Sequence, residues 1–134
     1  MIDRRKFFAA AAGLAGAAAF SSPALANAFK PYVASEVAAA IKTGEPVLVH
    51  VFAPWCLQCH IQRGYLHALL NDPKLAHVAL FRVDYDRQKD VLQALGGVPR
   101  STLIGYLHGR ETKRMSWGTQ KSDVMGIVDS VLKG

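Results

Sequence analysis

The sequence has little cysteine, little charge and no hydrophobic run long enough to cross a bilayer. Its 134 residues contain two cysteines, whereas the disulfide framework of a small secreted domain needs four or more. Charged residues make up 19% of the chain and hydrophobic residues 51%, a globular composition that excludes wholesale disorder. No basic run alternates with aromatic residues, so we attribute the net charge of +6 to solubility and expect no nucleic-acid partner. The length allows one folded domain.

The first 26 residues have the pattern of a secretory signal peptide. Arg4, Arg5 and Lys6 form a positive start, and the uncharged stretch 7–20 is rich in alanine and glycine. This stretch is shorter than the roughly 20 residues that a membrane-spanning helix needs. Ala24-Leu25-Ala26 is an A-x-A cleavage site. We therefore expect export to the periplasm, cleavage after Ala26 and a signal that resembles the twin-arginine type; the general secretory route and an uncleaved anchor remain alternatives.

The remaining residues, 27–134, are expected to form one α/β domain. The nearly continuous valine-rich run at 47–53 is typical of a strand buried on both faces. Apolar spacing and turn residues define the other elements. The predicted elements are helices over 33–42, 56–70, 87–95 and 121–132, and strands over 47–53, 78–83, 101–107 and 112–117, with a hairpin turn at 108–111. Helices and strands that alternate and are followed by a β-hairpin predict a mixed central sheet with helices on both faces.

Both cysteines lie in one motif, Trp55-Cys56-Leu57-Gln58-Cys59-His60, where the predicted strand 47–53 gives way to a helix. At a helix start, unpaired backbone N–H groups and the positive end of the dipole favour thiolate over thiol. Cys59 lies three residues after Cys56, on the same face of the helix. This spacing lets the two sulfurs form a disulfide and lets Cys59 resolve a mixed disulfide on Cys56. The expected compartment permits such chemistry.

At these residues the chain resembles the thioredoxin family. The run from Val47 to Cys59 ends in Phe-Ala-Pro-Trp-Cys-x-x-Cys, Gly97-Val98-Pro99 follows further along, and Gly118 precedes the last helix. The resemblance implies the thioredoxin fold and a thiol–disulfide oxidoreductase. It also implies that the redox-active Cys56–Cys59 disulfide serves without a metal or another cofactor.

The resemblance further implies roles for single residues. Cys56 is the attacking cysteine and Cys59 the resolving one. Pro99 would follow a cis peptide and shape the substrate groove, and the backbone of Val98 would pair with a bound peptide. A cis peptide is energetically costly, and an ordinary trans turn at Pro99 is the alternative. Trp55 is expected to shield the disulfide, with a place in the core as its alternative.

His50 departs from the family pattern, which has a buried Asp six residues before the first cysteine. Its position between Val49 and Val51 predicts burial, and burial favours the neutral imidazole. A neutral imidazole could accept the proton of Cys59. A packed, hydrogen-bonded core histidine is the simpler interpretation.

Two further positions differ from the family. Leu57-Gln58 is neither the Gly-Pro of common thioredoxins nor the Pro-His of the strong periplasmic oxidases, and this pair tunes the reduction potential. Arg100 lies in a lengthened path from Pro99 to the hairpin, which makes it a candidate contact for acidic substrates or a solvated loop charge. Asp84 and Asp86 are interpreted as a solvated strand end.

The motif also matches the c-type haem attachment pattern, C-x-x-C-H. That interpretation would make His60 an axial ligand and would need a sixth ligand such as Met115 or Met125. The strand patterns argue against it, because small c-type cytochromes are helical. A zinc site lacks a second Cys-x-x-Cys pair. A binding module that uses the fold without turnover would not need both cysteines.

These observations predict an exported, monomeric enzyme that reduces disulfides of envelope proteins. The sequence has no flavin or nicotinamide fingerprint, so the oxidised Cys56–Cys59 pair needs a partner for recycling, expected to be a membrane redox protein. Oxidation of substrates is the alternative direction. The absence of an inserted helical domain favours reduction, whereas Val98 before the proline resembles the periplasmic oxidases.

Overall fold

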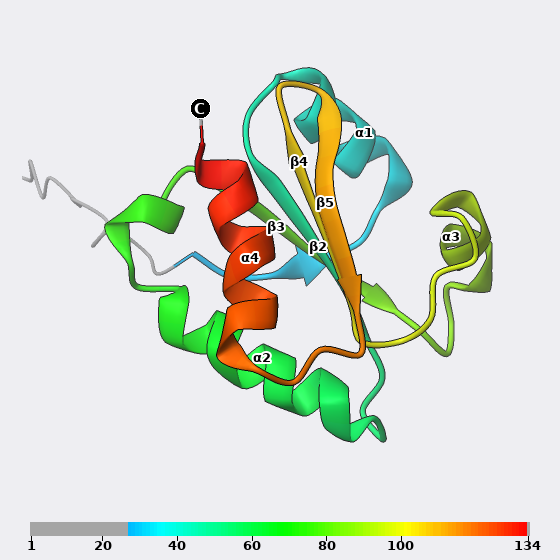
Figure 1. Ribbon diagram of the computed structural model, residues 1–134. Helices are drawn as coiled ribbons and strands as arrows, with labels where there is room; N and C mark the ends of the chain where they lie inside the picture. The colour runs from blue at the N-terminus through cyan, green and yellow to red at the C-terminus, as the bar shows by residue number, and fades with distance from the viewer. Residues whose placement is uncertain (1–26, 134) are drawn as a thin grey trace, which may run out of the picture.

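The computed structural model of the chain describes residues 27–133 (Figure 1). The predicted signal peptide, residues 1–26, and its cleavage site lie outside these residues. Over the part of the chain that is described, no helix combines the length and the apolar character that crossing a membrane requires.

The strands form one mixed sheet in the order β1-β3-β2-β4-β5. β1 and β2 run parallel to β3, whereas β4 runs antiparallel to β2 and to β5. The elements are β1 (Lys30–Pro31), α1 (Ala34–Lys42), β2 (Val47–Phe52), α2 (Leu57–Leu69), η2 (Pro73–Leu75), β3 (Ala79–Asp84), α3 (Lys89–Ala94), β4 (Thr102–Leu107), β5 (Arg110–Ser116) and α4 (Lys121–Leu132). The predicted elements and their order are confirmed. The structure also has β1 and the short 3-10 helix η2, which were not predicted because both are too short to produce a hydrophobic period.

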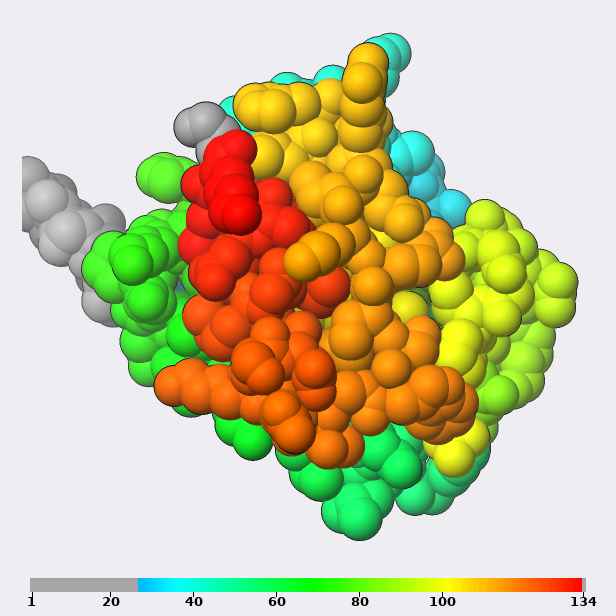
Figure 2. Space-filling model, in the orientation of Figure 1, coloured from blue at the N-terminus to red at the C-terminus, as the bar shows by residue number. Residues whose placement is uncertain are grey.

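β2 lies at the centre of the sheet and separates two hydrophobic cores. Val47, Val49 and Val51 pack in a core that includes residues of α1 and α3, and Leu48 packs in a core with residues of α2 and α4. Because both faces of β2 are covered, the strand has almost no position for an exposed polar side chain. The prediction of a mixed sheet with helices on both faces is confirmed. Figure 2 shows the face on which α4 packs along β5.

The β4–β5 hairpin ends the sheet on one side. Its turn consists of His108 and Gly109, which have left-handed φ angles of 55° and 79°, as a two-residue type I′ turn requires. The predicted turn at 108–111 is therefore two residues too long, because Arg110 and Glu111 already pair with β4. The hairpin leaves the opposite end of the sheet, where β2 ends, free for the cysteine motif.

Candidate active site

The two cysteines lie where β2 ends and α2 begins. Cys56 caps the N-terminus of α2 with extended backbone angles of −94° and 114°, and its Sγ accepts a hydrogen bond from the N–H of Cys59 at 3.2 Å. The sulfur thus satisfies one of the unpaired N–H groups at the helix start and lies at the positive end of the helix dipole. Both thiols are free and buried, with exposed fractions of 2% for Cys56 and 0% for Cys59.

Cys59 is the more deeply placed thiol. Burial, and then the hydrogen bond with Cys56, raises the pKa of the Cys59 thiol to about 11. Its Sγ points to the carbonyl oxygen of Val51 at 3.8 Å. Because the thiolate is the nucleophile in disulfide exchange, a protonated Cys59 is the less suited of the two thiols to a first attack on a substrate.

His50 lies in β2 and is fully buried, as predicted. Its Nε2 is 3.0 Å from Oε1 of Gln62. The amide nitrogen of Gln62 donates to the carbonyls of Ser101 and Gly118, at 3.0 and 2.8 Å. Oε1 is therefore the acceptor in the bond with His50, and the histidine carries its proton on Nε2.

The surroundings of His50 keep the imidazole neutral. Burial, and next the positive charge of Arg82, lowers the pKa of His50 to about 3, against the opposing effect of the hydrogen bond with Gln62. Nδ1 is buried and has no hydrogen-bond partner within residues 27–133. This arrangement is that of a packed, hydrogen-bonded core histidine. Transfer of the Cys59 proton to His50 stays a prediction.

Gln62 is a buried polar residue whose place in the site was not predicted. It lies between Cys59 and Leu66 among the buried residues of α2, and a polar side chain on an apolar helix face must find partners. The position of Gln62 on the apolar face of α2 is the sequence signal that could have revealed its place in the site. Its contact with the Gly118 carbonyl brings the chain close to the start of α4, where a Cβ on Gly118 would lie 2.6 Å from the Cβ of Asp123. The close approach explains the glycine before the last helix.

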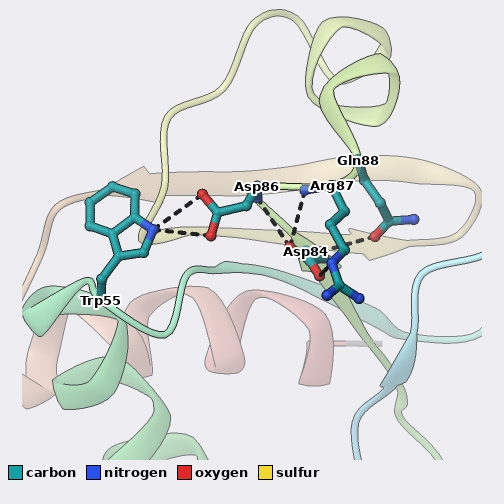
Figure 3. A network of polar contacts seen from close by, with 5 residues as sticks. All are labelled: Trp55, Asp84, Asp86, Arg87 and Gln88. Carbon is teal, nitrogen blue, oxygen red and sulfur yellow. Dashed lines mark hydrogen bonds and ion pairs between the residues drawn. The ribbon is translucent and has the colours of Figure 1, made fainter.

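Trp55 is 58% exposed, yet its indole is held in place (Figure 3). Its Nε1 donates to both carboxylate oxygens of Asp86, at 3.1 and 3.0 Å, and its ring packs edge-on against Tyr85, with the centroids 6.1 Å apart. Asp86 lies just after β3, and its own N–H donates to Asp84. Asp86 is exposed at the end of the strand, as expected, and its carboxylate has an additional part, because it fixes the tryptophan that precedes Cys56.

Arg100 lies between two indole rings. Its guanidinium carbon is 4.8 Å from the ring centroid of Trp55 and 4.6 Å from that of Trp117. Nε of Arg100 is buried without a hydrogen-bond partner in the described part of the chain. Stacking of this kind orients a planar guanidinium, so Arg100 is not a freely solvated loop charge. We call Trp55, Arg100 and Trp117 the tryptophan–arginine rim.

The loop from α3 to β4 corrects one prediction. Residues 27–133 contain no cis peptide bond, so the predicted cis peptide before Pro99 is wrong and the trans alternative holds. The loop turns instead at Gly96, Gly97 and Ser101, whose left-handed φ angles are 99°, 73° and 53°. The N–H of Ser101 then donates to the Val51 carbonyl at 3.0 Å. The lengthened loop thus returns to β2 through left-handed residues.

Val98 lies in the same loop and is buried. Its N–H is directed to the carbonyl of Leu92 at 3.3 Å. A peptide that pairs with the Val98 backbone must therefore use the carbonyl of this residue, unless the loop rearranges.

The residues of the haem alternative have other contacts. His60 Nε2 donates to the carbonyl of Pro54 at 2.6 Å, and its Nδ1 accepts from Arg63 at 3.2 Å. Met115 Sδ accepts from the N–H of Gly118 at 3.2 Å. The described residues contain no group of three or more His, Cys, Asp or Glu side chains placed to hold a metal ion.

A buried strand that delivers a Cys-x-x-Cys pair to a helix N-terminus defines a class of proteins that exchange thiols and disulfides. Comparison with known families agrees: the family model for thioredoxin matches residues 28–130. The chain belongs to the thioredoxin family. With both cysteines present, it is a thiol–disulfide oxidoreductase, a member of a family that acts on protein thiols and disulfides.

Individual relatives support the assignment. The chain is similar to Trxlp from Edwardsiella tarda EIB202, with 36% identity, a TM-score of 0.67 and coverage of 71% of this chain and 92% of that one. Thioredoxin H-type from Fagopyrum esculentum is 28% identical over 83 residues, which are 62% of this chain and 69% of the relative. Mitochondrial thioredoxin 3 from Saccharomyces cerevisiae shares the fold, with a TM-score of 0.64, 18% identity and coverage of 75% and 94%.

Proposed function

We propose that this protein is an exported, monomeric reductase of disulfides in envelope proteins. The observation that carries the proposal is the pairing of Cys56 at the start of α2 with a buried Cys59 whose pKa is raised to about 11. The two thiols thereby differ in reactivity, as a two-step reduction requires. The signal-peptide pattern of residues 1–26 supports a periplasmic location.

The reaction begins with attack of the Cys56 thiolate on one sulfur of a substrate disulfide. The other substrate sulfur leaves as a thiolate and takes up a proton, and a mixed disulfide joins Cys56 to the substrate. Cys59 then loses its proton and attacks Sγ of Cys56. The bond between Cys56 and the substrate sulfur breaks, and that sulfur leaves as a thiolate that takes up a proton. The Cys56–Cys59 pair has given two electrons to the substrate and is now a disulfide.

Each neighbour of the dithiol has a part in this scheme. Trp55, held by Asp86, is the residue we propose to shield the pair from solvent. Val98 and Pro99 belong to the loop that returns to the end of β2 near the cysteines and offers its carbonyl side to a peptide. A dithiol of a membrane redox protein returns the two electrons after each cycle. We propose no metal and no organic cofactor.

Oxidation of substrates is a second candidate, favoured by one observation. Sγ of Cys56 accepts the N–H of Cys59 at the start of α2, a position that favours the Cys56 thiolate. A thiolate stabilised there also stabilises the reduced protein, and a stabilised reduced form makes a stronger oxidant. The charge of Arg82 acts on the Cys59 thiolate instead, which forms only during resolution of the mixed disulfide because the pKa of Cys59 is raised to about 11.

The reduction potential of the Cys56–Cys59 pair distinguishes the two directions. Equilibration with glutathione is expected to give a value near −270 mV, as for thioredoxin; a value near −120 mV would identify an oxidase instead. Insulin reduction with dithiothreitol should be accelerated by the wild type and not by Cys56→Ser. If neither variant accelerates it and no potential can be measured, the chain is a binding module.

Location is tested separately, by fractionation of cells that make the full chain. Recovery in the periplasmic fraction with Asn27 as the first residue supports export. Retention in the cytoplasm with residues 1–26 attached contradicts it. A membrane-bound full-length form would indicate the uncleaved anchor.

A further inference from the structure

A basic cavity lies beside the first turns of α2, apart from the two thiols. Its volume is about 480 Å³, and its lining comes from α2 and β3: His60, Arg63, Gly64, His67 and Arg82. Four of these five residues carry basic side chains, and none carries a carboxylate. The exchange reaction proposed for the cysteines uses no group that opens into this cavity except the charge of Arg82.

Arg82 enters the cavity from β3, where it pairs in register with His50 of β2. Its guanidinium carbon lies 4.3 Å from the ring centroid of Phe29 and 5.4 Å from that of Phe52. Nε and Nη2 are buried and have no hydrogen-bond partner within residues 27–133. A buried charge that lacks a partner is costly, and the ion pairs of the described residues supply no counter-charge for this guanidinium.

Arg63 approaches the same ring from α2. Its guanidinium carbon is 4.9 Å from the centroid of Phe52, and its Nη2 donates to Nδ1 of His60 at 3.2 Å. His60 is itself held by the Pro54 carbonyl. The guanidinium of Arg63 is therefore oriented, with further donors to offer. Two guanidinium groups thus share the ring of Phe52.

No carboxylate offsets these two charges in the described residues. The ion pairs there join Arg87 to Asp84 and Arg114 to Glu111. Repulsion from Arg63 adds to burial in lowering the pKa of Arg82 to about 10. Like charges that line one cavity, with unused donors, are stabilised by an anion between them.

We propose that the cavity binds a small free oxyanion such as phosphate or sulfate, held between the guanidinium groups of Arg63 and Arg82. Guanidinium forks match the oxygen spacing of these anions. The cavity volume of about 480 Å³ lies in the range of small-molecule sites, which begins at about 300 Å³. The cavity therefore has room for one such anion. His67 lies at the exposed edge of the cavity, within reach of solvent.

The test is titration calorimetry of the purified full chain with sodium phosphate and sodium sulfate, and with sodium chloride at matched ionic strength. Wild type is expected to bind phosphate and sulfate saturably with one site, and chloride without saturation. Arg63→Gln should raise the dissociation constant about tenfold, which corresponds to the loss of one charged hydrogen bond. Arg63→Gln combined with Arg82→Gln should abolish binding.

The matched control is Arg110→Gln, which removes an exposed arginine from β5, the edge strand separated from β3 by β2 and β4. This variant should bind as the wild type does. The proposal is overturned if the wild type shows no saturable heat with phosphate or sulfate, or if Arg63→Gln and Arg110→Gln bind equally well. Arg63→Gln alone decides the matter if the double variant does not fold. The result is independent of disulfide reductase activity, which is measured without these anions.

Discussion

His50 Nε2 donates a hydrogen bond of 3.0 Å to Gln62 Oε1, and both side chains are fully buried. The bond joins the central strand to α2 one turn beyond Cys59, in the layer where thioredoxins usually have a buried Asp. A neutral, hydrogen-bonded pair thus replaces a titratable carboxyl group. It stabilises the same strand–helix contact and is neutral at pH 7, because the pKa of His50 is lowered to about 3.

The first prediction concerns stability at acidic pH. An unfolded histidine has a pKa of about 6.5, and that of folded His50 is about 3. The unfolded chain therefore binds a proton that the folded chain rejects, so this contribution to stability is complete above pH 6.5 and is lost as pH falls toward 3. The loss is about 1.4 kcal/mol per pH unit. Urea unfolding at pH 7 and pH 5 measures it.

His50→Gln is the variant for this test, because carboxyl groups also titrate at low pH. The stability difference between pH 7 and pH 5 should be smaller in His50→Gln than in wild type by about 2 kcal/mol. His67→Gln removes an exposed histidine and should leave the difference unchanged. Equal pH dependence in wild type and His50→Gln would show that His50 is protonated in the folded state.

The second prediction concerns proton transfer. If His50 is a structural residue, His50→Leu leaves the pH dependence of disulfide exchange between pH 6 and 8 unchanged. Its stability should fall by about 1–3 kcal/mol, because Gln62 Oε1 loses its donor. Stopped-flow rates with a small disulfide measure the profile. A profile that loses one ionisation in the variant would assign His50 as the acceptor of the Cys59 proton.

The sequence predicted the elements that have a long hydrophobic period and the site that has a specific motif. The strand around Val49 and the helix after Cys56 are both found within one or two residues of their predicted bounds. Strand Lys30–Pro31 was missed because its two residues have no period, and because pairing with β3 defines it. Tertiary contacts, which local spacing does not encode, define such short elements.

The side-chain contacts around the dithiol could not be predicted in the same way. Arg100 stacks on Trp55 and Trp117, and each of these three residues comes from a different loop. Their meeting depends on left-handed φ angles at Ser101 and Trp117, of 53° and 69°, which non-glycine residues rarely adopt. The peptide before Pro99 is trans, although the resemblance to relatives with a shorter loop implied a cis bond. Loop geometry is thus the part of the site that the sequence left open.

The third prediction concerns resolution of the mixed disulfide. Arg82 is half-buried and interacts with the charge of a Cys59 thiolate, the species that attacks Sγ of Cys56. Removal of this cation disfavours the thiolate, so Arg82→Gln should slow release of the substrate from Cys56 by up to about tenfold, which corresponds to about 1.4 kcal/mol. Stopped-flow release of a thiol from a preformed mixed disulfide on Cys56 measures the rate. Arg87→Gln, at an exposed arginine of the same region, is the control; an equal slowing in both variants, or no slowing in Arg82→Gln, would contradict the argument.

The last prediction concerns substrate choice at the tryptophan–arginine rim. Arg100 presents a positive charge between two exposed indoles next to Cys56, and its Nε lacks an acceptor within the described chain. A carboxylate on a substrate can pair with this partly exposed guanidinium. Arg100→Ala should therefore lower kcat/KM for a disulfide peptide with flanking glutamates by about tenfold, the effect of one charged hydrogen bond. Arg100→Ala should reduce the same peptide with flanking lysines as fast as the wild type does, or faster. Arg100→Lys should restore part of the preference, because it keeps the charge without the planar stack. An equal loss on both peptides would mean that Arg100 only supports Trp55, through the stack that also holds Trp117.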